Sequence, residues 1–231
     1  MSYKDNFSNH REILDTLRAR ICLIPPQATE PMHETAVAQE FNVSRTPVRQ
    51  VLQTLAREQL IEIRPSVGAT VTKLNPETKK ESYYIYRDLM EIAARLAEGK
   101  PLPDGTMLDL ASIEGILNSD PVVSNSLFVS LAIRVQTTLS TLIHDDIIDD
   151  AASAAFFRMT RWRVPEYQIS PDLHWATFRK NIRATTEAAR SGDPAHVLRT
   201  VVGLSEKLVK LTIDQEDMAN QDTKQRRTGV A

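Results

Sequence analysis

Two amphipathic segments separated by a very tight break constrain the fold of this chain more than any other feature. The first carries apolar residues at Ala36, Val37 and Phe41, and the second repeats them at helical spacing over residues 48–55. The break between them is centred on residues 42–43. Two helices joined by so short a turn must cross steeply, so we predict a helix-turn-helix.

The second helix is predicted to begin at a clear N-terminal signal. Ser44 can accept a hydrogen bond from a first-turn N–H group, and Pro47 falls where the helix needs no N–H donor. Arg45, Thr46 and Arg49 then lie opposite the apolar stripe. We therefore predict an exposed helix face that is rich in hydrogen-bond donors.

The period of the apolar residues changes from 3.6 to 2 after Leu60. Residues 61–64 and 69–74 then read as two strands joined by a turn. A β-hairpin directly behind such a helix is a wing. Its tip at Ser66 and Gly68 would reach the minor groove or the flanking phosphates of DNA while the helix lies in the major groove.

The residue types on the predicted helix face suit nucleic acid. Arg45 and Arg49 can each donate two hydrogen bonds to a guanine, whereas Ser44, Thr46 and the helix N-terminus suit phosphate oxygens. The alternative is an ordinary solvated helix face. The order of helix, turn, helix and hairpin favours DNA recognition over that alternative.

Residues 32–74 resemble the N-terminal domain of GntR-type transcriptional regulators. The resemblance is carried by residues 43–49, Val-Ser-Arg-Thr-Pro-Val-Arg, by the leucines that follow, and by the Ile-Arg-Pro, Gly and Val pattern of the wing. It implies operator contacts from the second helix and the wing. The expected DNA-binding residues are Thr35, Ser44, Arg45, Thr46, Arg49, Arg64, Ser66 and Gly68.

Two positions depart from the pattern of the resembling family. Gln59 stands where the family usually has glycine, which bears on the turn into the wing. Thr35 stands where some members carry a DNA-contacting arginine, which bears on one base contact.

The rest of the chain shows helical periodicity and no convincing strand. A stripe at Ile85, Leu89, Ile92 and Leu96 predicts the first helix of this part, and further helices are predicted around Ile113 and over residues 127–142, 147–159, 175–189 and 194–211. The predicted fold class is mainly α: an N-terminal winged helix-turn-helix of three helices plus a β-hairpin, then an all-α antiparallel bundle of about six helices.

We predict three parts along the chain. Residues 1–74 form the winged domain, residues 75–215 form an all-helical domain for effector binding and dimerisation, and residues 216–231 form a flexible tail without apolar periodicity.

A helical bundle behind such a winged domain is similar to the FadR-type subfamily, and residues 86–97 resemble the first helix of its effector domain. Many members hold a divalent metal with one Asp and three His. The corresponding positions are Asn125, Val129, Ile182 and Leu204. These are a poor ligand set, so we predict that the metal is absent and that no cofactor is bound.

Other histidines leave alternatives open. His144 stands among aspartates at 145, 146, 149 and 150, which could bind a metal, although acids at a helix start more often favour the helix dipole. His174 and His196 could supply a rearranged metal site.

A bundle that senses an organic acid needs a cation inside an apolar cavity. The candidates on or near the predicted core faces are Arg87, Arg134, Arg158 and Arg161. The alternative is that they are surface arginines whose stems cover apolar residues.

Composition limits the remaining possibilities. The formal net charge of −2 means that DNA affinity must come from a local patch. The single cysteine, Cys22, excludes an internal disulfide, and no signal peptide or membrane span is recognisable, so we expect a cytoplasmic protein without a membrane partner.

No glycine-rich phosphate loop, nucleophile elbow or His-Glu-x-x-His motif occurs, so we predict no enzyme.

These observations predict a metabolite-responsive transcriptional regulator, most simply a repressor, that binds a pseudo-palindromic double-stranded DNA operator as a homodimer. The alternative is a helical-bundle enzyme or ligand carrier whose winged domain is a protein-interaction module. A salt titration of DNA binding separates the two, because phosphate contacts release counterions.

Overall fold

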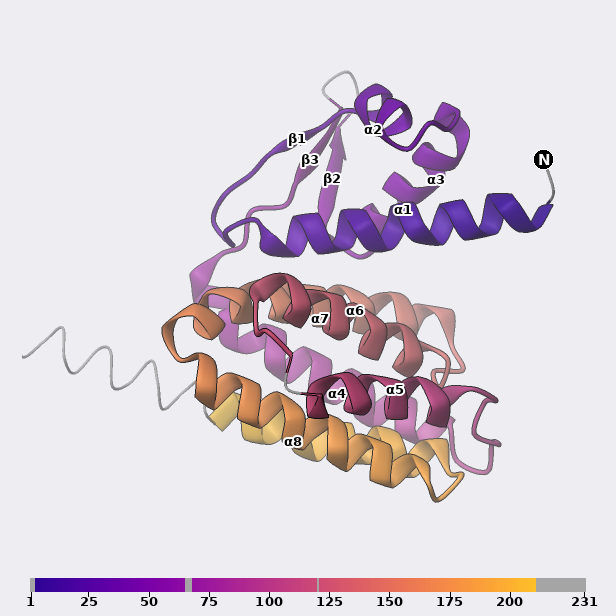
Figure 1. Ribbon diagram of the computed structural model, residues 1–231, viewed down its shortest axis with the longest axis vertical. Coiled ribbons are helices and arrows are strands. Elements are labelled where there is room, and N and C mark those ends of the chain that lie inside the picture. The colour runs from indigo at the N-terminus through magenta and orange to yellow at the C-terminus, as the bar shows by residue number, and fades with distance from the viewer. Residues whose placement is uncertain (1–2, 65–67, 120, 211–231) are drawn as a thin grey trace, which may run out of the picture.

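The computed structural model describes the backbone of residues 3–64, 68–119 and 121–210, and the side chains of these ranges from residue 10 onward. Ser66 and the predicted tail at 216–231 lie outside the described residues. The chain forms a winged domain that lies against a bundle of helices (Figure 1). The predicted fold class is confirmed.

Three helices and a small sheet make up the winged domain. The helices are α1 (Tyr3–Leu23), α2 (Glu34–Glu40) and α3 (Arg45–Arg57), and the strands are β1 (Pro31–Met32), β2 (Ile61–Arg64) and β3 (Gly68–Val71). The strands are antiparallel in the order β1-β3-β2. The sequence did not indicate β1, because two residues are too few to show a period of 2.

The predicted apolar stripe of the second helix is confirmed. Val48, Val51 and Leu55 of α3 are fully buried, and α1 covers them with Leu17 and Ile21. The turn between α2 and α3 is closed by a hydrogen bond from the Val43 N–H group to the Ala38 carbonyl oxygen, 3.0 Å apart. This packing fixes which side of α3 remains exposed.

The bundle consists of α4 (Lys79–Leu96), α5 (Thr106–Asn118), α6 (Asn125–Ser140), α7 (Asp146–Ile169), α8 (Pro171–Ala189) and a helix over residues 194–210. A short 3₁₀ turn, η1 (Pro76–Thr78), links it to the winged domain. Helix α4 packs mainly on α7, and α5 packs on α8. Helix α7 is longer than predicted, since it continues through Pro165.

The helix predicted from Ile85, Leu89, Ile92 and Leu96 is confirmed as α4, but of these residues only Leu89 packs partly against the core. Ile85, Ile92 and Leu96 are 45%, 41% and 44% exposed, and the buried side instead carries Tyr86, Met90 and the alanines at 93 and 94. Both sides of this helix are apolar, so the pattern alone could not choose between them. The small alanines allow α7 to approach closely, which explains why that side is buried.

The two domains are joined by Arg161 of α7, whose side chain is 1% exposed. One terminal nitrogen donates to the Thr72 carbonyl oxygen at 2.5 Å, and the other lies 3.5 Å from the carbonyl oxygens of Pro25 and Pro26. All three acceptors belong to the winged domain or the segment that leaves it. Arg161, predicted as an effector-binding cation, therefore directs its donors to the other domain and not into the bundle.

Within the residues that the structure describes, no helix combines the length and the apolar character needed to cross a membrane.

Replacing Arg161 with alanine should lower the free energy of unfolding by about 3 kcal/mol, because buried carbonyl oxygens lose their donors and a cavity remains. Urea denaturation followed by circular dichroism measures this change. The control is Arg183→Ala on the exposed side of α8, which should change stability by less than about 0.5 kcal/mol. Equal stability of the two variants would contradict the assigned role of Arg161.

Candidate nucleic-acid interface

Helix α3 presents a polar side opposite its buried stripe. Arg45, Thr46, Arg49 and Gln50 are all exposed. Figure 1 shows α2 and the end of the hairpin where β2 stops and β3 starts on the side of the winged domain that lies away from the bundle. A duplex could approach this side without meeting the bundle.

Ser44 occupies the N-cap position of α3 with an extended backbone, but its side chain makes no capping hydrogen bond, so the predicted cap is corrected. The residue is exposed. Its hydroxyl therefore lies beside first-turn N–H groups, where the helix dipole favours a phosphate oxygen.

Arg49 already has an anionic neighbour. Its guanidinium lies 2.9 Å from a carboxylate oxygen of Glu34, and its side chain is 65% exposed. Such an exposed pair is weak, at about 0–1 kcal/mol, so DNA can replace the carboxylate. Arg45 makes no ion pair within the described part of the chain. Thr35, which follows Glu34 on α2, is exposed.

Two of the predicted DNA-binding residues, Arg64 and Gly68, lie at the end of the wing where β2 stops and β3 starts. Arg64 lies opposite Gly68 in the β2–β3 register, and its exposed side chain forms an ion pair with Glu62 at 2.8 Å. Gly68 has a φ of 101°, a left-handed conformation that favours glycine. Ser66, between them, lies outside the described residues.

The C-terminal end of α3 meets helix α7. Glu58 is buried and forms a hydrogen-bonded ion pair with Arg18, whose Nε lies 3.0 Å from Glu58 Oε2. Burial raises the pKa of the Glu58 carboxyl, while Arg18 opposes this change. Arg18 also lies over the ring of Phe157 in α7, with 5.1 Å between the guanidinium carbon and the ring centre.

Gln59, which replaces the usual glycine of the resembling family, has a φ of 55°. This left-handed conformation explains why glycine is favoured at that turn. Its side-chain oxygen accepts a hydrogen bond from Arg158 of α7. The departure at Gln59 therefore adds a contact between the two domains.

The remaining predicted effector residues do not gather in one place. Arg87 forms an ion pair with Asp88 and lies 5.1 Å over the Tyr84 ring, Arg134 donates to Ser112, and Arg158 lies at the domain boundary. Their role in effector binding stays a prediction.

An inward arginine that sequence reasoning missed is Arg163 of α7. It is 6% exposed, lies over the rings of Phe128 and Tyr167 at 5.1 and 5.5 Å, and donates to the Tyr167 hydroxyl at 3.1 Å. Trp175 and Phe178 extend this aromatic cluster. Among the described residues it has no carboxylate partner. Arg161 and Arg163 both lie beyond the predicted helix end at residue 159, and only Arg161 was named as a candidate.

The predicted metal positions hold no ligand set. Val129 and Ile182 are buried apolar residues, and no group of three or more His, Cys, Asp or Glu side chains in the described ranges is placed to bind an ion. Asp145, beside His144, instead caps α7 through the Ile148 N–H group. The predicted absence of a cofactor stays a prediction.

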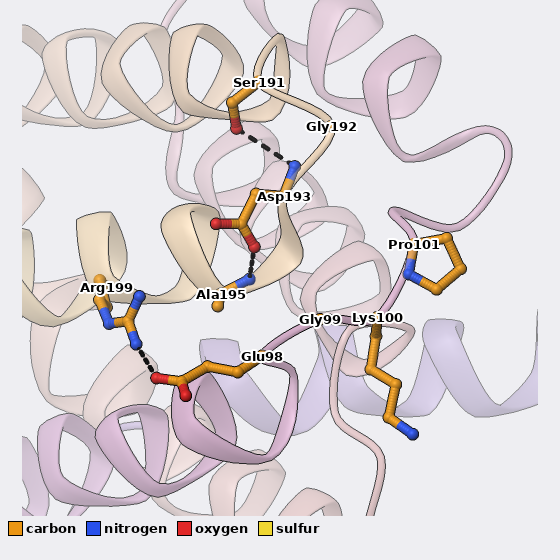
Figure 2. Close-up of a pocket in the computed structure, with 9 residues that line it drawn as sticks. All are labelled: Glu98, Gly99, Lys100, Pro101, Ser191, Gly192, Asp193, Ala195 and Arg199. Atoms are coloured by element: carbon orange, nitrogen blue, oxygen red, sulfur yellow. Dashed lines mark hydrogen bonds and ion pairs between the residues drawn. The ribbon is translucent and has the colours of Figure 1, made fainter.

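A surface pocket lies between the end of α4 and the loop after α8 (Figure 2). Asp193 accepts a hydrogen bond from the Ala195 N–H group and Ser191 accepts one from that of Asp193, while Arg199 pairs with Glu98. Its arginine is therefore already paired with a carboxylate, which makes this pocket a weaker effector site than the surroundings of Arg163.

Residues 9–71 match the family of bacterial regulatory proteins, gntR family. The chain is 37% identical over 90 residues to the HTH-type transcriptional repressor RspR of Escherichia coli K12, over 38% of this chain and 39% of that protein. It is 28% identical over 94 residues to an HTH-type transcriptional regulator in an unstable DNA locus of Streptomyces ambofaciens, over 41% and 39%. The chain thus spans about two fifths of the length of these relatives.

Two solved structures share the fold over most of the chain. E. coli McbR/YncC has a TM-score of 0.62 at 15% identity and covers 91% of this chain and 98% of its own. A structural-genomics GntR regulator from Rhodococcus sp. RHA1 has a TM-score of 0.55 at 16% identity, with coverage of 90% and 98%. The matched relatives are named as transcriptional regulators and not as enzymes, in agreement with the prediction.

The pH dependence of stability should report on His174, which is buried beside Tyr167. Burial, and then the nearby cations Arg163 and Lys79, lower the pKa of His174 below its usual 6.5, while Glu166 opposes them. The folded state therefore prefers neutral imidazole, so stability is present above pH 6.5 and is lost as the pH falls through the folded pKa.

In urea denaturation at a series of pH values, His174→Gln should lose less stability than the parent as the pH falls below 6.5. The matched control is His196→Gln, at an exposed histidine, which should follow the parent. Parallel curves for His174→Gln and the parent would show that His174 does not contribute.

Proposed function

We infer that this chain, whose residues 9–71 belong to the gntR family of bacterial regulatory proteins, is a transcriptional regulator that binds double-stranded DNA through α3 and the wing. The observation that carries this inference is the exposed set of Arg45, Thr46 and Arg49 on a helix whose opposite side is fully buried. A helix held by its core can enter the major groove without rearrangement.

The contacts divide by chemistry. Arg45 and Arg49 can each donate two hydrogen bonds to a guanine, and Arg49 exchanges Glu34 for the base when it does so. Ser44 and Thr46 suit phosphate oxygens near the helix N-terminus. Arg64 suits phosphates or the minor groove next to the wing.

We propose that the operator is pseudo-palindromic and that a homodimer binds it. Two copies of α3 related by two-fold symmetry would read two half-sites about one helical turn apart. RspR is named a repressor, and we propose the same role for this chain.

The bundle is proposed to sense a small organic acid. The supporting observation is the buried guanidinium of Arg163, which lies over the stacked rings of Phe128 and Tyr167 and has no carboxylate partner among the described residues. A carboxylate-bearing metabolite would supply the missing anion. Arg163 is thereby a stronger candidate than Arg87 and Arg134, which lie partly at the surface.

Helix α7 provides the connection between effector and DNA. It carries Arg163 inside the bundle, and it carries Phe157, Arg158 and Arg161 against the winged domain. A carboxylate that moves α7 would therefore move the end of α3 as well. Because the coupling is thermodynamic, operator DNA must change the affinity for the effector by the same factor.

Arg49→Ala should weaken binding to a duplex selected from a random library by about 1–3 kcal/mol, and it should relax the base preference at one position of each half-site. Fluorescence anisotropy with the selected duplex and its single-base variants measures both effects. Arg183→Ala, at an exposed arginine of the bundle, is the control and should bind like the parent. Unchanged base preference in Arg49→Ala would remove Arg49 from base recognition.

Arg163→Gln should abolish the effect of carboxylates on stability. We expect at least one member of a panel of aromatic and aliphatic monocarboxylates to raise the melting temperature of the parent protein, because a ligand that binds the folded state stabilises it. The same compound should leave Arg163→Gln unchanged. An equal rise in the variant, or no rise in the parent with any compound, would contradict the assignment.

A further inference from the structure

The exposed side of α4 is apolar along its length. Ile85, Ile92 and Leu96 follow one another at intervals of seven and four residues, which places them on one stripe of the helix. Tyr84, which is 37% exposed, lies beside this stripe, on the side of the helix that carries Asp88 and Arg95. Contiguous apolar surface of this kind marks an interaction site more often than scattered apolar residues do.

We propose that this α4 surface pairs with the same surface of a second copy of the chain, with the two helices antiparallel about a two-fold axis near Ile92. The choice of a second copy as the occupant rests on the proposed function, which requires a homodimer. The surface itself follows from the structure. It lies on the side of α4 that does not pack on α7.

The charges on the stripe favour this arrangement. Asp88 and Arg95 are both exposed. Along the helix axis, Asp88 lies one turn before Ile92 and Arg95 lies one turn after it. In an antiparallel pair centred on Ile92, Asp88 of each copy faces Arg95 of the other copy. Two-fold symmetry therefore gives two identical Asp88–Arg95 ion pairs in one dimer. Because one helix supplies both partners, the surface is complementary to itself.

Both residues can exchange their present neighbours for the second copy. Asp88 pairs with Arg87 at 2.6 Å, and Arg95 lies 3.5 Å from Glu91. These contacts are exposed and within one helix, so they are weak and replaceable.

The length of α4 agrees with a role at the centre of the interface. Its 18 residues span about 27 Å. A stable interface covers about 800 Å² of each partner, so surface next to α4 must contribute as well. In such an interface the apolar residues at the centre dominate the affinity, and the charges at its edge set orientation.

The first test is Ile92→Asp in the full chain, measured by sedimentation velocity over a range of concentrations without DNA. We expect a parent dimer and a dimer dissociation constant at least about 30-fold higher in the variant. Leu108→Asp, at a residue of α5 that is 73% exposed, should remain a dimer. A monomeric parent, or an Ile92→Asp variant that dimerises like the parent, would overturn the proposal.

Charge reversal gives a second test that keeps the apolar stripe intact. Asp88→Arg and Arg95→Asp should each weaken the dimer by about three- to tenfold, and the double variant should restore it. An equimolar mixture of the two single variants should form a mixed dimer in preference to either homodimer. Additive weakening in the double variant would exclude the antiparallel pairing.

These outcomes are separable from the failure of the proposed function. If the Ile92→Asp variant stays dimeric and the parent binds duplex DNA, only the surface is wrong. If the parent dimerises through α4 but binds no selected duplex, the interface stands and the function proposed for α3 fails.

Discussion

Arg161, a buried cation of α7, binds backbone carbonyl oxygens of the winged domain and so helps to fix how the two domains lie against each other. A guanidinium cannot be deprotonated at ordinary pH, so its burial is unfavourable unless its donors find acceptors. Its terminal nitrogens donate to carbonyl oxygens of Thr72, Pro25 and Pro26, while the Nε has no hydrogen-bond partner among the described residues. Burial lowers the pKa of Arg161, and its charge remains. Because these carbonyls flank the start and the end of the small sheet, the position of α7 determines the orientation of the winged domain.

The same helix links the proposed recognition surface to the interior of the bundle. Phe157 lies beneath Arg18, which holds Glu58 at the end of α3. Six residues further along α7, Arg163 lies over the stacked rings of Phe128 and Tyr167. Contacts of one helix with both the winged domain and the aromatic cluster give a physical route for coupling, with no need for a change inside the winged domain. The exposed positions of Arg45 and Arg49 at the opposite end of α3 are consistent with this division of roles.

The sequence predicted the winged domain well because its signals are local. Residues 43–49, the stripe from Val48 to Leu55 and the change of period after Leu60 all act within a few residues of one another. The stripe of α4 was assigned to the wrong side because that helix has two apolar sides, and only tertiary packing decides between large aliphatic residues and alanines. The acceptors of Arg161 lie more than 80 residues away, as the separations of 89 and 136 residues show. No local pattern could reveal them.

The central claim is that the exposed side of α3 neutralises DNA phosphates and reads base edges, and the salt dependence of duplex binding tests it most directly. Each neutralised phosphate contributes about −0.9 to the slope of log affinity against log salt concentration. We expect a slope of several such units for the parent, and a shallower slope when Arg45 and Arg49 are both replaced by alanine. Affinity that does not change with salt, or a slope that does not depend on these two arginines, would contradict the account and favour a winged domain that binds protein.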